Sequence, residues 1–116
     1  MKLTFDDKYE FIPKWNGNET DSEPVKILCR YLSSPERSRC IKKEILADND
    51  KSTVKIVYHE VDLFTLSVEK IENLEVNGKK VKTAAEFLAE ENLSSLFDEI
   101  VNEIVRRNTR SNLKNS

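Results

Sequence analysis

Glycine is scarce in this chain, which limits the chemistry that its loops can support. The 116 residues include two glycines, Gly17 and Gly78. Loops that cradle phosphate need several closely spaced glycines, as in GxGxxG and GxxxxGK[ST], and neither pattern occurs. The GxSxG and HExxH patterns are missing as well. These absences exclude the enzyme classes that depend on such motifs.

Histidine and cysteine are also few. His59 is the single histidine, and no nucleophile or orienting partner is apparent for it, so we expect it at the surface or at a strand end. Cys29 and Cys40 are too far apart for a CxxC pattern, and we expect buried structural thiols. The stretch DNDKSTVKIVYH resembles a calcium loop, but Thr53 replaces the required glycine and His59 the required glutamate. We therefore expect no metal, no cofactor and no enzymatic activity.

Long apolar runs and a strong net charge are missing too. No run approaches the roughly 20 residues that a membrane span needs. The net charge is −2, so no overall field favours nucleic acid or a membrane surface. No charged and then apolar leader opens the chain, and we expect a cytoplasmic protein with reduced thiols. Residues 106–116 hold four bases and no acid, but no aromatic residue there could stack on RNA.

Alternating apolar residues predict the strands. Residues 3–15 carry aromatic side chains at odd positions, and Pro13 favours an edge strand. Residues 16–24 have the composition of a loop. Residues 25–31 and 53–59 alternate clearly and predict two further strands.

Capping signals and spacings of three and four predict the helices. Ser33 and Glu36 have capping-box spacing, and we expect a helix over residues 33–46. Apolar spacing predicts a second helix over residues 61–74. Asn77-Gly78 indicates a tight turn, with a two-residue hairpin as one possibility. The next helices are expected over 84–91, after a capping box of Thr83 and Glu86, and from a cap at Ser94 or Ser95 to about residue 107.

This order of elements predicts an α+β fold. We expect a small N-terminal antiparallel sheet with helices packed on one face and a C-terminal helical segment. We expect one domain over residues 1–107, followed by a disordered basic tail over residues 108–116.

Two apolar stripes on the expected helices have two interpretations. They can close the core, or part of them can form a groove for a partner helix. The candidate partner-binding residues are Phe64, Val68 and Ile71 on one helix and Phe97, Ile100, Val101 and Ile104 on the last helix.

The second half of the chain resembles a known family. The segment VEKIENLEVNGKKVKTAAEFLAEENLSSLFDEIVNEIV has an Ile-x-Asn-Leu run, a V-[DN]-G-K turn, a Thr-Ala helix start and a D-E-I in the last helix. This pattern is similar to that of the tail assembly chaperones of long-tailed bacteriophages. The opening LTFDDKYEFIPKWNGN resembles the extended start of such proteins.

The resemblance implies a protein that binds another protein. Members of this family bind the long helical tape measure protein, keep it soluble and help tail tube protein polymerise around it in the bacterial host cell. The possible partners are therefore the tape measure protein, the tail tube protein and further copies of this chain. Two alternatives stay open: a structural tail component, such as a completion or connector protein, and a nucleic-acid-binding regulator. The mixed charge of the helices, with Glu86, Asp98 and Glu103, disfavours the regulator.

Overall fold

The computed structural model describes residues 1–3, 7–48 and 51–109, with the backbone alone described for residues 43–48 and 51–55. Its core sheet has the strand order β1 (Lys8–Phe11), β2 (Lys26–Arg30), β5 (Val68–Glu72), and both pairings are antiparallel. The expected α+β class is confirmed, although β5 comes from the middle of the chain. β1 lies at an edge of the sheet, as Pro13 indicated.

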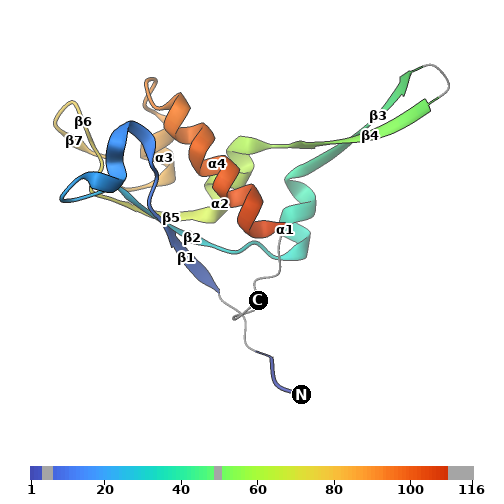
Figure 1. Cartoon of the computed structure of the whole chain (residues 1–116), viewed down its shortest axis with the longest axis horizontal. Coiled ribbons are helices and arrows are strands. Elements are labelled where there is room, and N and C mark those ends of the chain that lie inside the picture. The colour runs from blue at the N-terminus through green and yellow to red at the C-terminus, as the bar shows by residue number, and fades with distance from the viewer. Residues whose placement is uncertain (4–6, 49–50, 110–116) are drawn as a thin grey trace.

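The helices pack on one face of this sheet (Figure 1). They are α2 (Glu60–Ser67), α3 (Ala84–Leu88) and α4 (Ser94–Asn108). Ile27 and Cys29 alternate with less buried neighbours along β2, and both are almost fully buried. The side chains of one sheet face and one stripe of each helix therefore share a single core.

Two sequence signals are realised as expected. Ser33 caps α1 (Ser34–Arg39) because its hydroxyl oxygen accepts from the main-chain N–H of Glu36. The carboxylate of Glu36 accepts in turn from the main-chain N–H of Ser33, which completes the capping box. Asn77 and Gly78 have φ values of 52° and 78°, and they join β6 (Glu75–Val76) to β7 (Lys79–Lys80). Positive φ at both central residues is what a type I′ two-residue hairpin turn requires.

The expected helix over residues 61–74 is wrong in its second half. α2 ends at Ser67, and Val68 opens β5. A register shift pairs Leu28 with Lys70 but Cys29 with Val68, so one extra residue bulges out of β5. The bulge puts Val68 and Ile71 on the same buried face three residues apart, a spacing that is otherwise typical of a helix.

The expected helix over residues 33–46 is also too long. α1 ends at Arg39, and β3 (Ile41–Asp48) pairs antiparallel with β4 (Lys51–Tyr58). β-branched residues in both strands favour this ladder over a continued helix. We call the β3–β4 hairpin the arm and the rest of the described fold the body.

The arm projects away from the body (Figure 1). The chain measures 55 × 44 × 24 Å, and its radius of gyration is 16.6 Å. A compact domain of this length would have a radius of gyration of about 13 Å. The expanded shape agrees with an element that lies outside the body.

The loop before β2 is fastened to α4. η1 (Trp15–Thr20) is a short 3-10 turn in which Asn18 holds the main chain at Pro13 and Val25 by side-chain hydrogen bonds. The Trp15 indole N–H donates to Ser95 Oγ at 2.8 Å. Ser95 is therefore used in this contact, and neither expected serine caps α4, whose N-cap position is Leu93.

The last helix extends through Asn108, one residue beyond the expected end of the domain. Asn108 is buried. Residues 110–116 of the expected tail lie outside the described part of the chain. No helix among the described residues has the length and apolar character to cross a membrane.

Candidate interaction surface

The two stripes predicted to bind a partner pack against each other. Phe64 of α2 contacts Phe97 of α4, with ring centroids 5.2 Å apart, and Phe87 of α3 at 4.9 Å. Six of the seven candidates are buried in the core, namely Phe64, Val68, Ile71, Ile100, Val101 and Ile104, and Phe97 is partly buried. In this conformation the stripes form the core, so a partner could reach them only if the helices separated. Their role in partner binding stays a prediction.

The quoted family-like segment has structural roles along its length. Ile71 and Leu74 are buried. Asn73, with φ of 64°, donates from its side-chain nitrogen to the carbonyl oxygen of Pro24 at 3.0 Å. Val81 is buried after the tight turn, and Thr83 accepts from the amide of Glu86. The apolar residues of this segment therefore help to build the core of the body.

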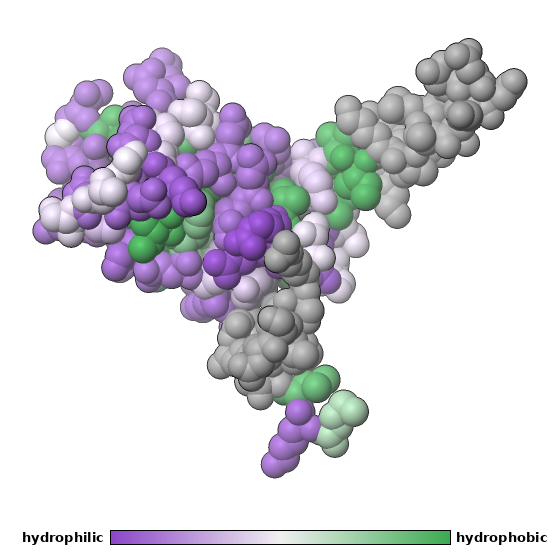
Figure 2. All heavy atoms as spheres, in the orientation of Figure 1, coloured by the Kyte–Doolittle hydropathy of each residue, from purple (hydrophilic) through white to green (hydrophobic). Residues whose placement is uncertain are grey.

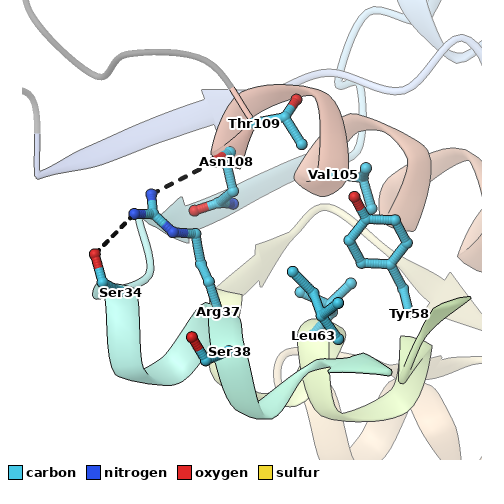
Figure 3. A pocket seen from close by; sticks show the side chains of 9 residues that line it. Ser34, Arg37, Ser38, Tyr58, Leu63, Val105, Asn108 and Thr109 are labelled. Carbon is cyan, nitrogen blue, oxygen red and sulfur yellow. Dashed lines mark hydrogen bonds between the residues drawn. The ribbon is translucent and has the colours of Figure 1, made fainter. Parts of the chain in front are cut away.

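A pocket of about 260 Å³ opens at the root of the arm (Figure 3). Its apolar wall consists of Ile41, Tyr58, Leu63 and Val105. Its polar rim consists of Ser34, Arg37, Ser38, Asn108 and Thr109. Residues of α1, β3, β4, α2 and α4 meet here. Because the pocket joins segments from residue 34 to residue 109, local sequence patterns did not identify it.

Arg37 lies on the pocket rim between two neutral acceptors. Its guanidinium donates to Ser34 Oγ at 3.0 Å and to the main-chain oxygen of Asn108 at 3.5 Å (Figure 3). Across the described residues, no carboxylate forms an ion pair with Arg37. The rim therefore has a positive charge that is available to an acidic group.

Asn108 closes the end of the pocket and connects α4 to the chain after β2. Its side-chain oxygen accepts from the amide of Leu32 at 3.0 Å, and its side-chain nitrogen donates to the carbonyl of Ile104 at 2.8 Å. Both bonds are buried, where an unpaired polar group is costly. This side chain therefore helps to fix the C-terminal end of α4 against the chain after β2.

Exposed apolar side chains continue from the pocket onto the arm. Ile56 of β4 is 51% exposed, and Val61 at the start of α2 is 55% exposed. Figure 2 shows apolar residues gathered where the arm leaves the body. Large exposed apolar groups that lie together are typical of a binding surface.

An ionic cluster lies on α4, away from the pocket's apolar wall. Glu103 accepts from Arg107, one helical turn later, at 2.7 Å and also pairs with Arg106. Burial raises the pKa of Glu103, but the hydrogen bonds from the two arginines outweigh it and lower that pKa. The Arg107 guanidinium lies 4.8 Å from the centre of the Tyr9 ring. The charged groups of this cluster are thus paired with each other, and we interpret the cluster as structural.

The two cysteines and the histidine were the remaining candidates for reactive or metal-binding side chains. Cys29 and Cys40 are free and buried, as expected, and burial raises the pKa of Cys29 to about 12. Burial also raises the pKa of Cys40. His59 is exposed just before α2. The described residues hold no group of three or more histidine, cysteine or acidic side chains placed to bind a metal ion.

No protein-family model, curated protein or solved structure matches this chain. The resemblance to tail assembly chaperones therefore stays a prediction.

Proposed function

We propose that this protein is a non-enzymatic tail assembly chaperone that binds the long helical tape measure protein in the host cytoplasm. What supports the proposal is the exposed apolar surface at the root of the arm, together with the resemblance of residues 68–105 to that family. A tape measure protein is a long helix with an apolar stripe, which aggregates when the stripe is uncovered. An apolar pocket beside an exposed strand ladder suits such a stripe.

The charge on the rim supports an acidic feature in the partner. Arg37 lies beside the apolar wall with two neutral acceptors. A carboxylate next to the apolar stripe of a partner helix would gain a charge-assisted hydrogen bond there. Arg37→Lys would keep the charge but lose the planar pair of donors.

Co-expression with the long helical protein encoded next to this chain tests the proposal. We expect wild type and Leu88→Asp, a substitution of an exposed apolar residue on α3 outside the arm, to keep that protein in the soluble fraction. We expect Ile56→Asp to reduce the soluble amount, because Ile56 is exposed at the apolar surface. Circular dichroism should first show that both variants fold. Failure of wild type to bind or solubilise the helical protein would overturn the proposal.

The fate of the protein separates a chaperone from a structural tail component. A chaperone leaves before the tail is complete, whereas a completion or connector protein stays in it. We expect mass spectrometry of purified tails to contain the tape measure protein and to lack this chain. Finding it in finished tails in stoichiometric amounts would favour the structural component instead.

A further inference from the structure

Arg37 differs from the arginines that hold the fold together. Arg30 pairs with Glu36, and Arg107 pairs with Glu103, so the charge of each is neutralised inside the body. Arg37 lines the pocket at the root of the arm, and no ion pair within the described part of the chain involves it. Its positive charge is therefore placed where a bound group can meet it.

The two hydrogen bonds of Arg37 leave room for a stronger acceptor. Ser34 Oγ accepts at 3.0 Å, but the main-chain oxygen of Asn108 lies 3.5 Å away, well beyond the usual length of about 2.9–3.0 Å. A guanidinium has five N–H donors, and a carboxylate can accept two of them side by side in a pair about twice as strong as a neutral hydrogen bond. None of the nine residues that line the pocket is acidic, so the pocket wall does not already supply that carboxylate.

The size of the pocket suits side chains better than a whole small molecule. Its volume is about 260 Å³, whereas sites for drug-sized ligands run from about 300 to 1,000 Å³. Tyr58, Leu63 and Val105 make its wall apolar, and Figure 3 shows Tyr58 and Leu63 across the pocket from the Arg37 guanidinium. An apolar side chain that lies next to a carboxylate matches both parts of this site.

Tyr58 also borders a second hollow, and that hollow has the opposite charge. Val61 and Phe97 supply its apolar part, and Glu60 and Asp62 supply two acids. Both acids lie in the first turn of α2, where they also complement the helix dipole. A carboxylate would be repelled there. The charges on the two sides of Tyr58 therefore decide at which end of this surface a bound acid can lie.

We propose that the pocket binds an apolar side chain of a partner helix, and that an acidic side chain three or four residues away on that helix binds Arg37. Residues at this spacing lie on one helix face, with about 5–6 Å between their Cβ atoms, so one helix can present both groups together. The acid lies toward Arg37 and away from Glu60 and Asp62. The inference rests on the proposed function, which supplies the helical partner, and it adds which residues of that partner are bound.

Overlapping peptides test this inference. They cover the long helical protein encoded next to this chain, have about 25 residues or roughly seven helical turns each, and carry a fluorescein label. Fluorescence anisotropy with the purified full chain measures each Kd. We expect the tightest peptides to hold an apolar residue with Glu or Asp three or four residues away. Replacing that acid by its amide should weaken binding about tenfold, because a charge-assisted hydrogen bond is lost.

The matching change in this chain is Arg37→Gln, which should weaken binding of the same peptide about tenfold. Arg39→Gln is the matched control and should change the Kd less than about threefold, because Arg39 is exposed on the same helix and borders a different hollow. Arg37→Gln together with the amide peptide should bind little worse than either change alone, since both remove one contact. Circular dichroism should show that both variants fold. Fully additive losses, or equal losses from the two arginine variants, would overturn the proposal.

Val105→Phe tests the apolar half of the site. Val105 is partly buried at the pocket wall, so a larger ring takes up space that the partner's side chain needs. We expect binding about tenfold weaker, the size of losing one buried apolar side chain. Asn102→Phe on the exposed face of the same helix should change the Kd less than about threefold. Unchanged binding by a folded Val105→Phe variant would show that the pocket is not the site.

The outcomes separate this inference from the chaperone proposal. If wild type solubilises the co-expressed helical protein but peptide binding is absent or independent of Arg37, this inference is overturned and the chaperone proposal stands. If wild type neither solubilises the protein nor binds a peptide, both are overturned. If Arg37→Gln abolishes self-association in sedimentation velocity and leaves peptide binding unchanged, a second copy occupies the pocket, which also overturns this inference.

Discussion

The body and the arm place similar apolar residues in opposite environments. In the body, Ile100 and Ile104 of α4 are fully buried against the sheet and α2. On the arm, Ile56 is half exposed although it stands two residues before Tyr58, which lines the pocket. The difference shows that the described body covers these two isoleucines, whereas it leaves Ile56 of the arm largely uncovered. A structural role in the core therefore belongs to the first set, and a binding role for the second is part of the proposal above.

The largest contrast should appear when the same substitution is made in both regions. Ile104→Ala removes a side chain that is 0% exposed and should lower the free energy of unfolding by about 2–5 kcal/mol. Ile56→Ala should lower it by less than about 1 kcal/mol, since this side chain is half exposed. Urea denaturation at a concentration where the chain is monomeric measures both values. Equal losses would mean that the arm is part of the same core.

A second contrast concerns the polar connection at the pocket. Asn108→Ala leaves the amide of Leu32 without its buried acceptor and should cost about 1–3 kcal/mol of stability. Asn102→Ala on the exposed face of α4 is the matched control, and it should be neutral or slightly stabilising, because alanine favours the helix. The same denaturation experiment compares the two variants. If Asn108→Ala is as mild as the control, this bond does not fix the end of α4.

The alkylation rates of the two thiols would compare local opening of the body with local opening at the root of the arm. Cys29 lies on β2 within the body, whereas Cys40 directly precedes β3. Both are buried, and burial raises the pKa of each, so both thiols should resist alkylation at neutral pH. Local opening at the arm would expose Cys40 without unfolding the body, so we expect Cys40 to react faster than Cys29.

Variants with one thiol each make this measurable. Cys29→Ala reports on Cys40, and Cys40→Ala reports on Cys29. Equal labelling rates, each matching the rate of global unfolding, would show that the root of the arm opens only with the body.

The smallest expected effect on stability concerns the capping box of α1, next to the root of the arm. The hydrogen bonds from Arg30 and then from the amide of Ser33 lower the pKa of Glu36 to about 2. A lowered folded-state pKa means that the ionised carboxylate stabilises the fold above the ordinary value near 4.5, and that this stability is lost as the pH falls toward 2. Glu36→Gln should reduce the dependence of the free energy of unfolding on pH between about 4.5 and 2. Glu91→Gln, a substitution of an exposed residue, is the matched control. Parallel curves for both variants would show that Glu36 does not contribute.

Local sequence signals determined much of the body. The capping box at Ser33, the N-cap hydrogen bond at Thr83 and the Asn77-Gly78 hairpin are contacts between near neighbours, so short patterns sufficed to predict them. At Thr83 only half of the expected capping box forms, because Glu86 does not accept from the main-chain N–H of Thr83. The alternation in β2 and the apolar stripe of α4 likewise follow from the period of each element. These features gave the α+β class.

Tertiary structure alone decided which apolar faces are core. A bulge in β5 depends on the register against β2, and it made Val68 and Ile71 imitate helical spacing. The stripes that suggested a groove bury each other, because α2 and α4 pack side by side on one face of the sheet. The pocket arises where segments distant in sequence come together, and no local pattern encodes such long-range contacts.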